Sequence, residues 1–243
     1  MNRSAAVTLT VFAWILAVLL LDAGSGIWFQ RVLGLGTWAL LIGLLWGESR
    51  STRWQVAAVV VAATALEYTA SGLLGLYTYR LENIPSFVPP GHGLVYLAAL
   101  TIGRASLGTW AEFTLPKVAL VLGGAWALYG VTISSRPDSG GLLLFLILAV
   151  FILRGRAAAV YAAAFLVTGY LELLGTSIGT WAWSTHDFLG VTALGNPPSG
   201  IAGGYCFLDM VGLAAAVRLG GIAPPRPHLP ELPELPEPAA STA

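Results

Sequence analysis

Charged residues are scarce in this sequence of 243 residues. Only 10% are Asp, Glu, Lys or Arg, whereas 56% are hydrophobic and the mean hydropathy is +0.77. Soluble domains carry about 25% charged residues, so the composition indicates an integral membrane protein. The formal net charge of +0 offers no basic face for nucleic acid. Nucleic acid is therefore excluded as a partner, and a membrane lipid or another lipophilic small molecule is expected.

Side chains for metal binding and redox chemistry are also few. Cys206 is the single cysteine, so the chain has no internal disulfide and no thiol metal site. Neither His92 nor His186 lies in an HxxxH or HxxE pattern, the spacings at which a helix presents two metal ligands. The sequence therefore predicts neither a metal site nor a cofactor.

Apolar segments long enough to cross a bilayer, at about 20 residues each, occur about eight times. The expected spans are residues 5–22, 33–48, 54–76, 90–107, 114–133, 141–154, 157–180 and 198–217. The predicted fold class is an all-α polytopic membrane bundle of about eight helices, with one transmembrane domain over residues 1–221. Residues 222–243 are rich in proline, and we expect a disordered cytoplasmic tail there.

The distribution of Lys and Arg predicts the orientation in the membrane. With the N-terminus inside, the cytoplasmic segments hold nine basic residues and the external segments three. Cytoplasmic loops carry the excess of basic residues, so both termini are predicted on the cytoplasmic side of the inner (plasma) membrane. The nine are Arg3, Arg50, Arg53, Arg104, Lys117, Arg154, Arg156, Arg218 and Arg226, and the three are Arg31, Arg80 and Arg136.

One motif occurs twice in the chain. The first copy, residues 67–93, begins EYTASGLLGLYTY and ends FVPPGHG, and the second, residues 172–200, begins ELLGTSIGTWAW and ends GNPPSG. Four features match: Glu67 with Glu172, Gly75 with Gly179, Tyr77/Tyr79 with Trp181/Trp183, and Pro89-Pro90 with Pro197-Pro198. Four helices per half would give both copies the same orientation. We therefore predict a parallel repeat, with halves at about 1–110 and 111–221.

Three acids, Glu67, Glu172 and Asp209, are the candidate catalytic residues. Aromatic pairs collect at headgroup level, and Glu67 and Glu172 lie ten and nine residues before theirs. Counted along a helix, each carboxyl is roughly 14–15 Å deep. If Pro197 begins the last helix, Asp209 is roughly 18 Å deep. Acids inside a membrane usually face the bundle interior and are functional, so all three are expected to meet there. A polar cluster that only joins helices is the alternative.

Aromatic and polar side chains near these acids are the candidates for substrate binding. Aromatic faces can stabilise a carbocation, although the aromatic pairs fit a membrane belt equally well. His92 lies early in its helix, where an interfacial hydrogen-bonding role is the alternative. Asn196 is expected to cap the last helix, with Pro197 in its first turn. The candidates are Tyr68, Tyr77, Tyr79, His92, Tyr96, Tyr170, Trp181, Trp183, Asn196 and Tyr205.

The motif resembles bacterial and archaeal carotenoid-biosynthesis membrane proteins. An acid, a Gly-rich helix end, an aromatic-x-aromatic pair and a Pro-containing helix start look like the carotenoid hydratases and, more remotely, the small integral-membrane lycopene cyclases. The acidic PxEE-type signature of those cyclases is absent. The resemblance implies an enzyme that needs no cofactor and that protonates an alkene of a lipophilic isoprenoid, leading to hydration or cyclisation. Glu67 and Glu172 would be the family acids.

Two other functions fit the same residues. Parallel repeats with acids at the bilayer midplane are also found in secondary carriers, so a proton-coupled transporter or a lipid flippase is one alternative. A non-catalytic assembly subunit, whose acids hold helices together, is another. The substrate and the oligomeric state stay open.

Overall fold

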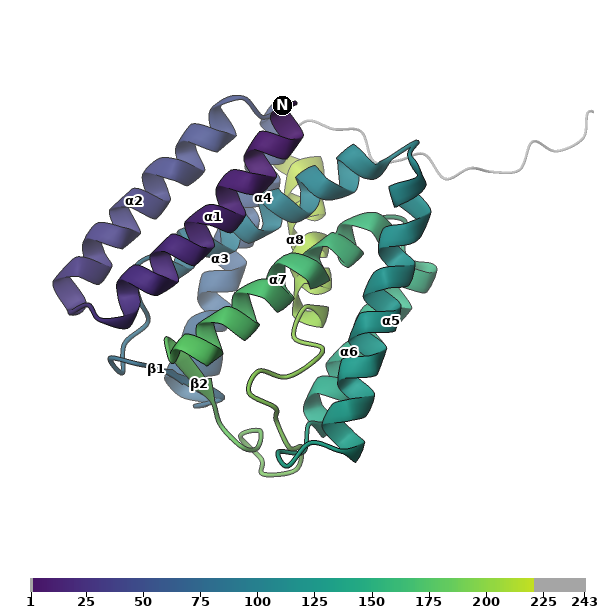
Figure 1. Cartoon of the computed structure of the whole chain (residues 1–243). Coiled ribbons are helices and arrows are strands. Elements are labelled where there is room, and N and C mark those ends of the chain that lie inside the picture. Colours follow the sequence, from purple (N-terminus) through teal and green to yellow (C-terminus); the bar gives the residue numbers. More distant parts are fainter. Residues whose placement is uncertain (1, 221–243) are drawn as a thin grey trace, which may run out of the picture.

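The computed structural model describes residues 2–220, so the predicted tail at 222–243 lies outside the described residues. Helices make up nearly all of the regular structure in 2–220, and the predicted all-α class is confirmed (Figure 1). The elements are α1 (Arg3–Ala23), α2 (Ile27–Trp46), α3 (Arg50–Glu67), the π-helical turn η1 (Tyr68–Leu73), β1 (Tyr77–Tyr79), α4 (Val88–Ser106), α5 (Trp110–Thr132), α6 (Ser139–Arg154), α7 (Ala158–Ile178), β2 (Trp181–Trp183) and α8 (Gly203–Leu219).

Five helices of the described chain are long and apolar enough to cross a membrane: α1, α2, α3 with η1, α5 and α7. The apolar helix α6 is shorter, with 16 residues. Many large apolar side chains on these helices are exposed, among them Val61, Val121 and Leu153. Soluble monomers rarely expose apolar patches of this extent, so the surface is compatible with a membrane protein.

The centre of the bundle is formed by two helix pairs. α4 packs against α7, and α3 packs against α8, whereas α1 and α2 lie on one flank and α5 and α6 on the other (Figure 1). Buried alanines on α4 and α7, including Ala98, Ala99 and Ala163, let these two helices approach closely. Gly103 on α4 lies so near Val160 on α7 that a Cβ at Gly103 would lie 2.9 Å from the Val160 Cα.

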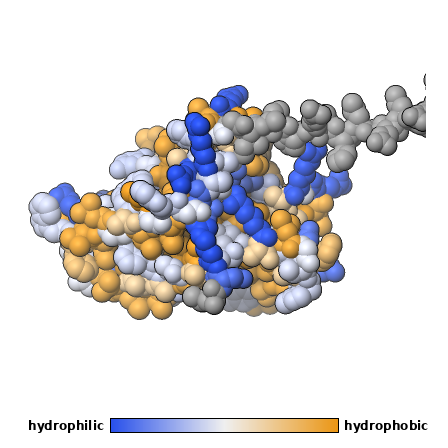
Figure 2. Space-filling view, turned by 90° about the horizontal axis from the view of Figure 1, so that it is seen from above, coloured by the Kyte–Doolittle hydropathy of each residue, from blue (hydrophilic) through white to orange (hydrophobic). Residues whose placement is uncertain are grey.

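Charged side chains join several helix ends on one face of the molecule. Glu48, between α2 and α3, pairs with Arg3 at the start of α1 and with Arg104 near the end of α4. Arg104 also donates to the Thr52 hydroxyl at 3.1 Å. Figure 2 looks onto the face where α1 begins and shows strongly hydrophilic side chains there, with hydrophobic ones around them.

At the opposite ends of α3 and α7, β1 and β2 form an antiparallel pair (Figure 1). Two hydrogen bonds flank it: the Arg80 amide donates to the Thr180 carbonyl, and the Ser184 amide donates to the Leu76 carbonyl, both at 2.9 Å. The two copies of the sequence motif therefore contact each other directly. The register is Tyr77 with Trp183, Thr78 with Ala182, and Tyr79 with Trp181.

The last helix starts later than the sequence predicts. α8 begins at Gly203, because the backbone amides of Gly195 and Ser199 donate to the Asp138 carboxylate at 2.8 Å and hold this segment as a loop against α6. Asn196 does not cap α8, and its side-chain oxygen accepts from the Trp183 amide at 2.9 Å instead. Asp209 is thus six residues into α8, about 9 Å along it, and the prediction that Pro197 begins the last helix is wrong.

Candidate functional site

A cavity of about 480 Å³ lies between the β1–β2 pair and the surrounding helices. Its walls are mostly apolar side chains from α1, α3, α4, α7 and α8, such as Ile15, Leu94 and Leu208. This volume falls within the range of about 300–1,000 Å³ that small-molecule sites occupy. The predicted site residues that line it are Glu67, Tyr77, Tyr79, His92, Glu172, Trp181, Trp183 and Tyr205.

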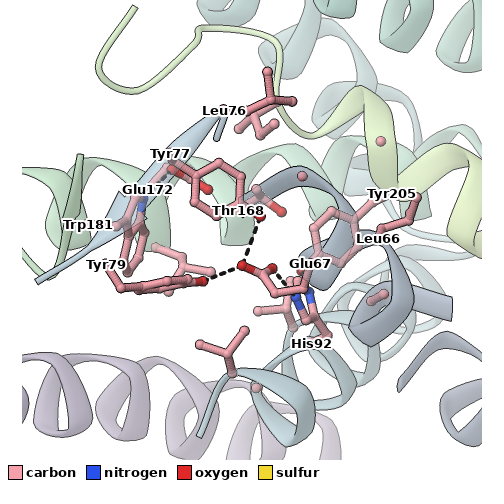
Figure 3. A pocket seen from close by; sticks show the side chains of 18 of the residues that line it. Leu66, Glu67, Leu76, Tyr77, Tyr79, His92, Thr168, Glu172, Trp181 and Tyr205 are labelled. Atoms are coloured by element: carbon pink, nitrogen blue, oxygen red, sulfur yellow. Dashed lines mark hydrogen bonds and ion pairs between the residues drawn. The ribbon is translucent and has the colours of Figure 1, made fainter. Parts of the chain in front are cut away.

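Three side chains lie within hydrogen-bond distance of the Glu67 carboxyl (Figure 3). Its side chain is buried, and Oε1 accepts from the Tyr79 hydroxyl at 2.6 Å and from the Tyr77 hydroxyl at 2.8 Å. Oε2 lies 3.1 Å from His92 Nε2. Burial, together with the nearby Glu67 carboxylate, raises the pKa of Tyr77 and Tyr79 well above the ordinary value of 10.0. Both tyrosines therefore stay neutral phenols that donate to Glu67.

His92 links Glu67 to helix α8. Its Nδ1 lies 2.9 Å from the Tyr205 hydroxyl, while its Nε2 faces Glu67. Imidazole and phenol can each donate and accept a proton. Tyr205, His92 and Glu67 therefore form a chain that can carry a proton to or from the Glu67 carboxyl.

Glu172 has a different set of partners. The indole nitrogens of Trp181 and Trp183 both donate to its Oε2, at 3.0 and 3.1 Å. An indole N–H only donates, so neither ring can take a proton from the carboxyl. No described residue hydrogen-bonds the other oxygen, Oε1, and Glu172 lines the cavity. Proton exchange at Glu172 is therefore limited to Oε1 and whatever occupies the cavity.

Each motif folds its aromatic pair back onto its own acid through a left-handed glycine. Gly75 has a φ of +60° and Gly179 a φ of +84°, a conformation that glycine adopts at little cost. The chain reverses there, and alternate residues of the following strand point to one face. The rings of each pair therefore hydrogen-bond the acid of their own motif. The segment from each acid to its aromatic pair is not one straight helix, as the depth count for Glu67 and Glu172 assumed.

Asp209 lies in a separate buried cluster. Its Oδ1 accepts from the Tyr96 hydroxyl at 2.6 Å, and its Oδ2 accepts from the Tyr161 hydroxyl at 3.3 Å. Asp209 does not line the cavity. The structure thus brings Glu67 and Glu172 to one site and turns the third predicted acid toward α4 and α7.

Four predicted substrate-binding residues, Tyr68, Tyr96, Tyr170 and Asn196, also lie outside the cavity lining. Tyr68 is 59% exposed, because the residue after Glu67 is rotated by about 100° from it on a helix. The Tyr170 ring packs on Phe12, with ring centroids 4.9 Å apart. Tyr96 is bound to Asp209, and Asn196 holds β2.

Some cavity residues have no clear signal in the sequence. Trp14 on α1 donates to the Thr37 hydroxyl on α2 at 3.1 Å, and both line the cavity. Asp187, in the loop between β2 and α8, lines it as well. Thr168 is the exception, because it lies four residues before Glu172 and residues at this spacing share a helix face. Its hydroxyl is buried without a hydrogen-bond partner among the described residues.

The loop between β2 and α8 is held in place by Arg136, on the link between α5 and α6. Its guanidinium donates to the backbone carbonyls of Leu194, Trp183 and Ser184 at 2.7–2.8 Å. Two of these carbonyls lie at the end of β2. Arg136 therefore fixes the strand that carries the indole donors of Glu172.

Comparisons of the chain with protein-family models, with curated proteins and with solved structures find no match. The resemblance to carotenoid-biosynthesis proteins stays a prediction from the motif residues. The function has to be inferred from the geometry of the cavity.

Proposed function

We propose that this chain is an integral membrane enzyme that acts on a lipophilic isoprenoid or carotenoid-like substrate by protonating an alkene, leading to hydration or cyclisation. The observation that supports this best is the pair of carboxyl groups in one mostly apolar cavity, one of them linked to a chain of proton-carrying groups. Apolar walls suit a hydrocarbon, and a carboxyl group can supply the proton.

In this proposal eight helices cross the bilayer, with both termini on the cytoplasmic side of the plasma membrane. The ion pairs of Glu48 with Arg3 and Arg104 lie at the proposed cytoplasmic end. At the other end, Arg80 donates to the carbonyls of Asp22 and Ser25. The excess of basic residues on the first side supports this orientation.

The strand pairing supports an internal duplication. A twofold axis through the middle of the sheet would exchange Tyr77 with Trp181 and Tyr79 with Trp183. Under that exchange the pair Tyr77–Trp183 becomes the pair Trp181–Tyr79, and both pairs occur in the register. The same axis would exchange α3 with α7 and α4 with α8. It would therefore turn the packed pair α3–α8 into the pair α7–α4, which is also packed. We therefore propose that the two halves arose as a parallel repeat.

Glu67 is the proton donor of the proposed reaction. In its acid form Glu67 carries the proton on Oε2, because Oε1 accepts from the two phenols. The alkene electron pair takes this proton and forms a new C–H bond, which leaves a carbocation on the neighbouring carbon and a carboxylate at Glu67. In hydration, water adds to the cation and then releases a proton to the Tyr205 hydroxyl at the cavity wall. In cyclisation, a second double bond attacks the cation, and the C–H proton that is lost takes the same path. The Tyr205–His92 chain provides a path that returns a proton to Glu67.

Glu172 supplies the opposite charge in this scheme. As a carboxylate held by two indoles, it lies along the same cavity as the proton donor. A fixed negative charge stabilises a cation strongly where water is excluded, and the indole faces of Trp181 and Trp183 add to this.

The test is deuterium incorporation into lycopene, an acyclic carotenoid, by the protein reconstituted in liposomes in heavy water. We expect deuterium to accumulate with the wild type and not with the double variant Glu67→Gln/Glu172→Gln. Gel filtration in detergent checks that the variant is folded. A double variant as active as the wild type would show that the acids only join helices, as in an assembly subunit.

A proton-coupled transporter or lipid flippase is the second candidate. The α-helical pattern of α3 changes to the π-turn η1 directly after Glu67, and interrupted helices beside acids are typical of secondary carriers. A pH change inside the liposomes on addition of lycopene, with the lycopene recovered unchanged, would favour the carrier.

A further inference from the structure

The cavity reaches the outer surface of the bundle beside Glu67. Among the described residues that line it, Leu66 and Thr69 are exposed, and the others are buried or half-buried. Leu66 is 53% exposed and directly precedes Glu67. Both exposed residues lie where α3 continues into η1, so the opening is on the side of the bundle, next to the acid.

The opening has a limit along the helix. Leu73, at the end of η1, is 79% exposed but does not line the cavity. Ala70, which lines the cavity from within η1, is half-buried. The exposed part of the lining therefore covers one turn, from Leu66 to Thr69.

Helix α8 forms the neighbouring wall, because it packs along α3 and contributes Gly204, Tyr205 and Leu208 to the lining. A Cβ added at Gly204 would have no atom within 4 Å. The preceding residue differs, since a Cβ at Gly203 would collide with the Leu144 carbonyl. Gly203 is therefore needed for packing, whereas Gly204 leaves space that a ligand can fill.

We infer that Leu66, Thr69 and Gly204 form a lateral doorway through which a hydrocarbon chain passes from the bilayer into the cavity, and that Gly204 sets its width. The inference rests on the proposed function, because that function requires a substrate dissolved in lipid. The doorway side chains carry no charge, so they select an uncharged chain. The opening lies beside Glu67, because Leu66, Glu67 and Thr69 all line the cavity at the junction of α3 and η1.

The test uses a diazirine-bearing hexadecane in liposomes, with the labelled peptides identified by mass spectrometry after illumination. We expect label on cavity-lining residues of the wild type. Gly204→Leu and Leu66→Trp fill the doorway and should each lower this labelling about tenfold, since a close-fitting space excludes added bulk. Gly43→Leu and Leu73→Trp are the matched controls: a Cβ at Gly43 has no atom within 4 Å, and neither residue lines the cavity.

Gly204→Ala is a milder variant that controls for a folding defect in Gly204→Leu. Alanine is favoured over glycine within a helix, and the methyl group enters open space, so this variant should fold and show a smaller loss of labelling. Equal labelling of the cavity in the wild type and in all three doorway variants overturns the doorway.

Deuterium incorporation into lycopene separates this inference from the proposed function. One outcome is that labelling falls in Gly204→Leu and Leu66→Trp, while the wild type incorporates no deuterium. This outcome supports the doorway and contradicts the proposed enzyme activity. Deuterium incorporation that is unchanged in Gly204→Leu supports the enzyme and removes the doorway.

Discussion

The two copies of the motif place a glutamate at matching positions and surround it with different donors. Glu67 is held by two phenols and an imidazole, whereas Glu172 is held by two indoles. Phenol and imidazole can pass a proton on, and indole cannot. One backbone arrangement therefore surrounds the first acid with groups that can exchange a proton and the second with groups that only donate a hydrogen bond.

The larger rings of the second copy also need more room on the helix. The Trp181 ring covers Gly175, where an added Cβ would overlap the indole. The residue that matches Gly175, three positions after Glu67, is Ala70, and the ring that matches Trp181 is the smaller phenol of Tyr77. Ring size and the residue three positions after the acid thus differ together between the copies.

Replacing each of the two acids by glutamine, one at a time, should have the largest effect on deuterium incorporation. Glu67→Gln removes the transferable proton, and because general acid catalysis contributes about 10²–10⁴-fold, deuterium incorporation should fall by that factor. Glu172→Gln keeps an acceptor for both indoles and loses only the charge, so a decrease of about tenfold is expected. Initial rates in the liposome assay measure both. Equal losses would mean that the two copies act alike.

Gly175→Ala should disturb the second copy by displacing Trp181 from Glu172. Overpacking of this kind costs about 1–3 kcal/mol of unfolding free energy. Adding Trp181→Tyr reproduces the Ala–Tyr combination of the first copy and should recover most of that loss. Thermal unfolding in detergent, followed by circular dichroism, measures the change, with Gly43→Ala as the control. A double variant less stable than Gly175→Ala alone would contradict the match between the copies.

Alkaline pH should distinguish the phenols from the indoles. The pKa of Tyr77 and Tyr79 is raised in the folded protein by burial and by Glu67, whereas in the unfolded chain both ionise near about pH 10. The folded state then holds more protons, so the free energy of unfolding falls as pH rises above that value. Tyr77→Phe/Tyr79→Phe should make this decline shallower, and Trp181→Phe/Trp183→Phe should not. Each double variant also loses hydrogen bonds, which lowers its stability at every pH. The measurement is therefore the slope of the free energy of unfolding between about pH 9 and about pH 11, compared between each variant and the wild type.

The order of the helices and the match of the two acids could be predicted from the sequence, because the length of apolar runs and the motif spacing are local features. Gly75 and Gly179 marked the point where each motif reverses. The direction of the rings could not be predicted, because it depends on the π-turn and on the pairing of β1 with β2. The premise of one straight helix from each acid to its aromatic pair was therefore wrong.

Contacts between distant parts of the chain explain the remaining differences. The start of α8 depends on Asp138, which is 61 residues before the Ser199 amide that it binds. His92 meets Glu67 across 25 residues and Tyr205 across 113. The second copy has Gly200 where the first has His92, so the repeat itself did not indicate a relay in only one half.

The smallest effect is expected at the centre of the sheet, where Thr78 faces Ala182 and both are exposed. Ala182→Thr makes the copies identical there, and because a cross-strand Thr pair contributes about 0.2–1 kcal/mol, stability should rise by no more than that. Thr78→Ala should have the opposite sign. Neither residue lines the cavity, so deuterium incorporation should not change. A marked loss of stability in Ala182→Thr would mean that the strands pair in another register, and the rings of both copies would then no longer lie over their acids.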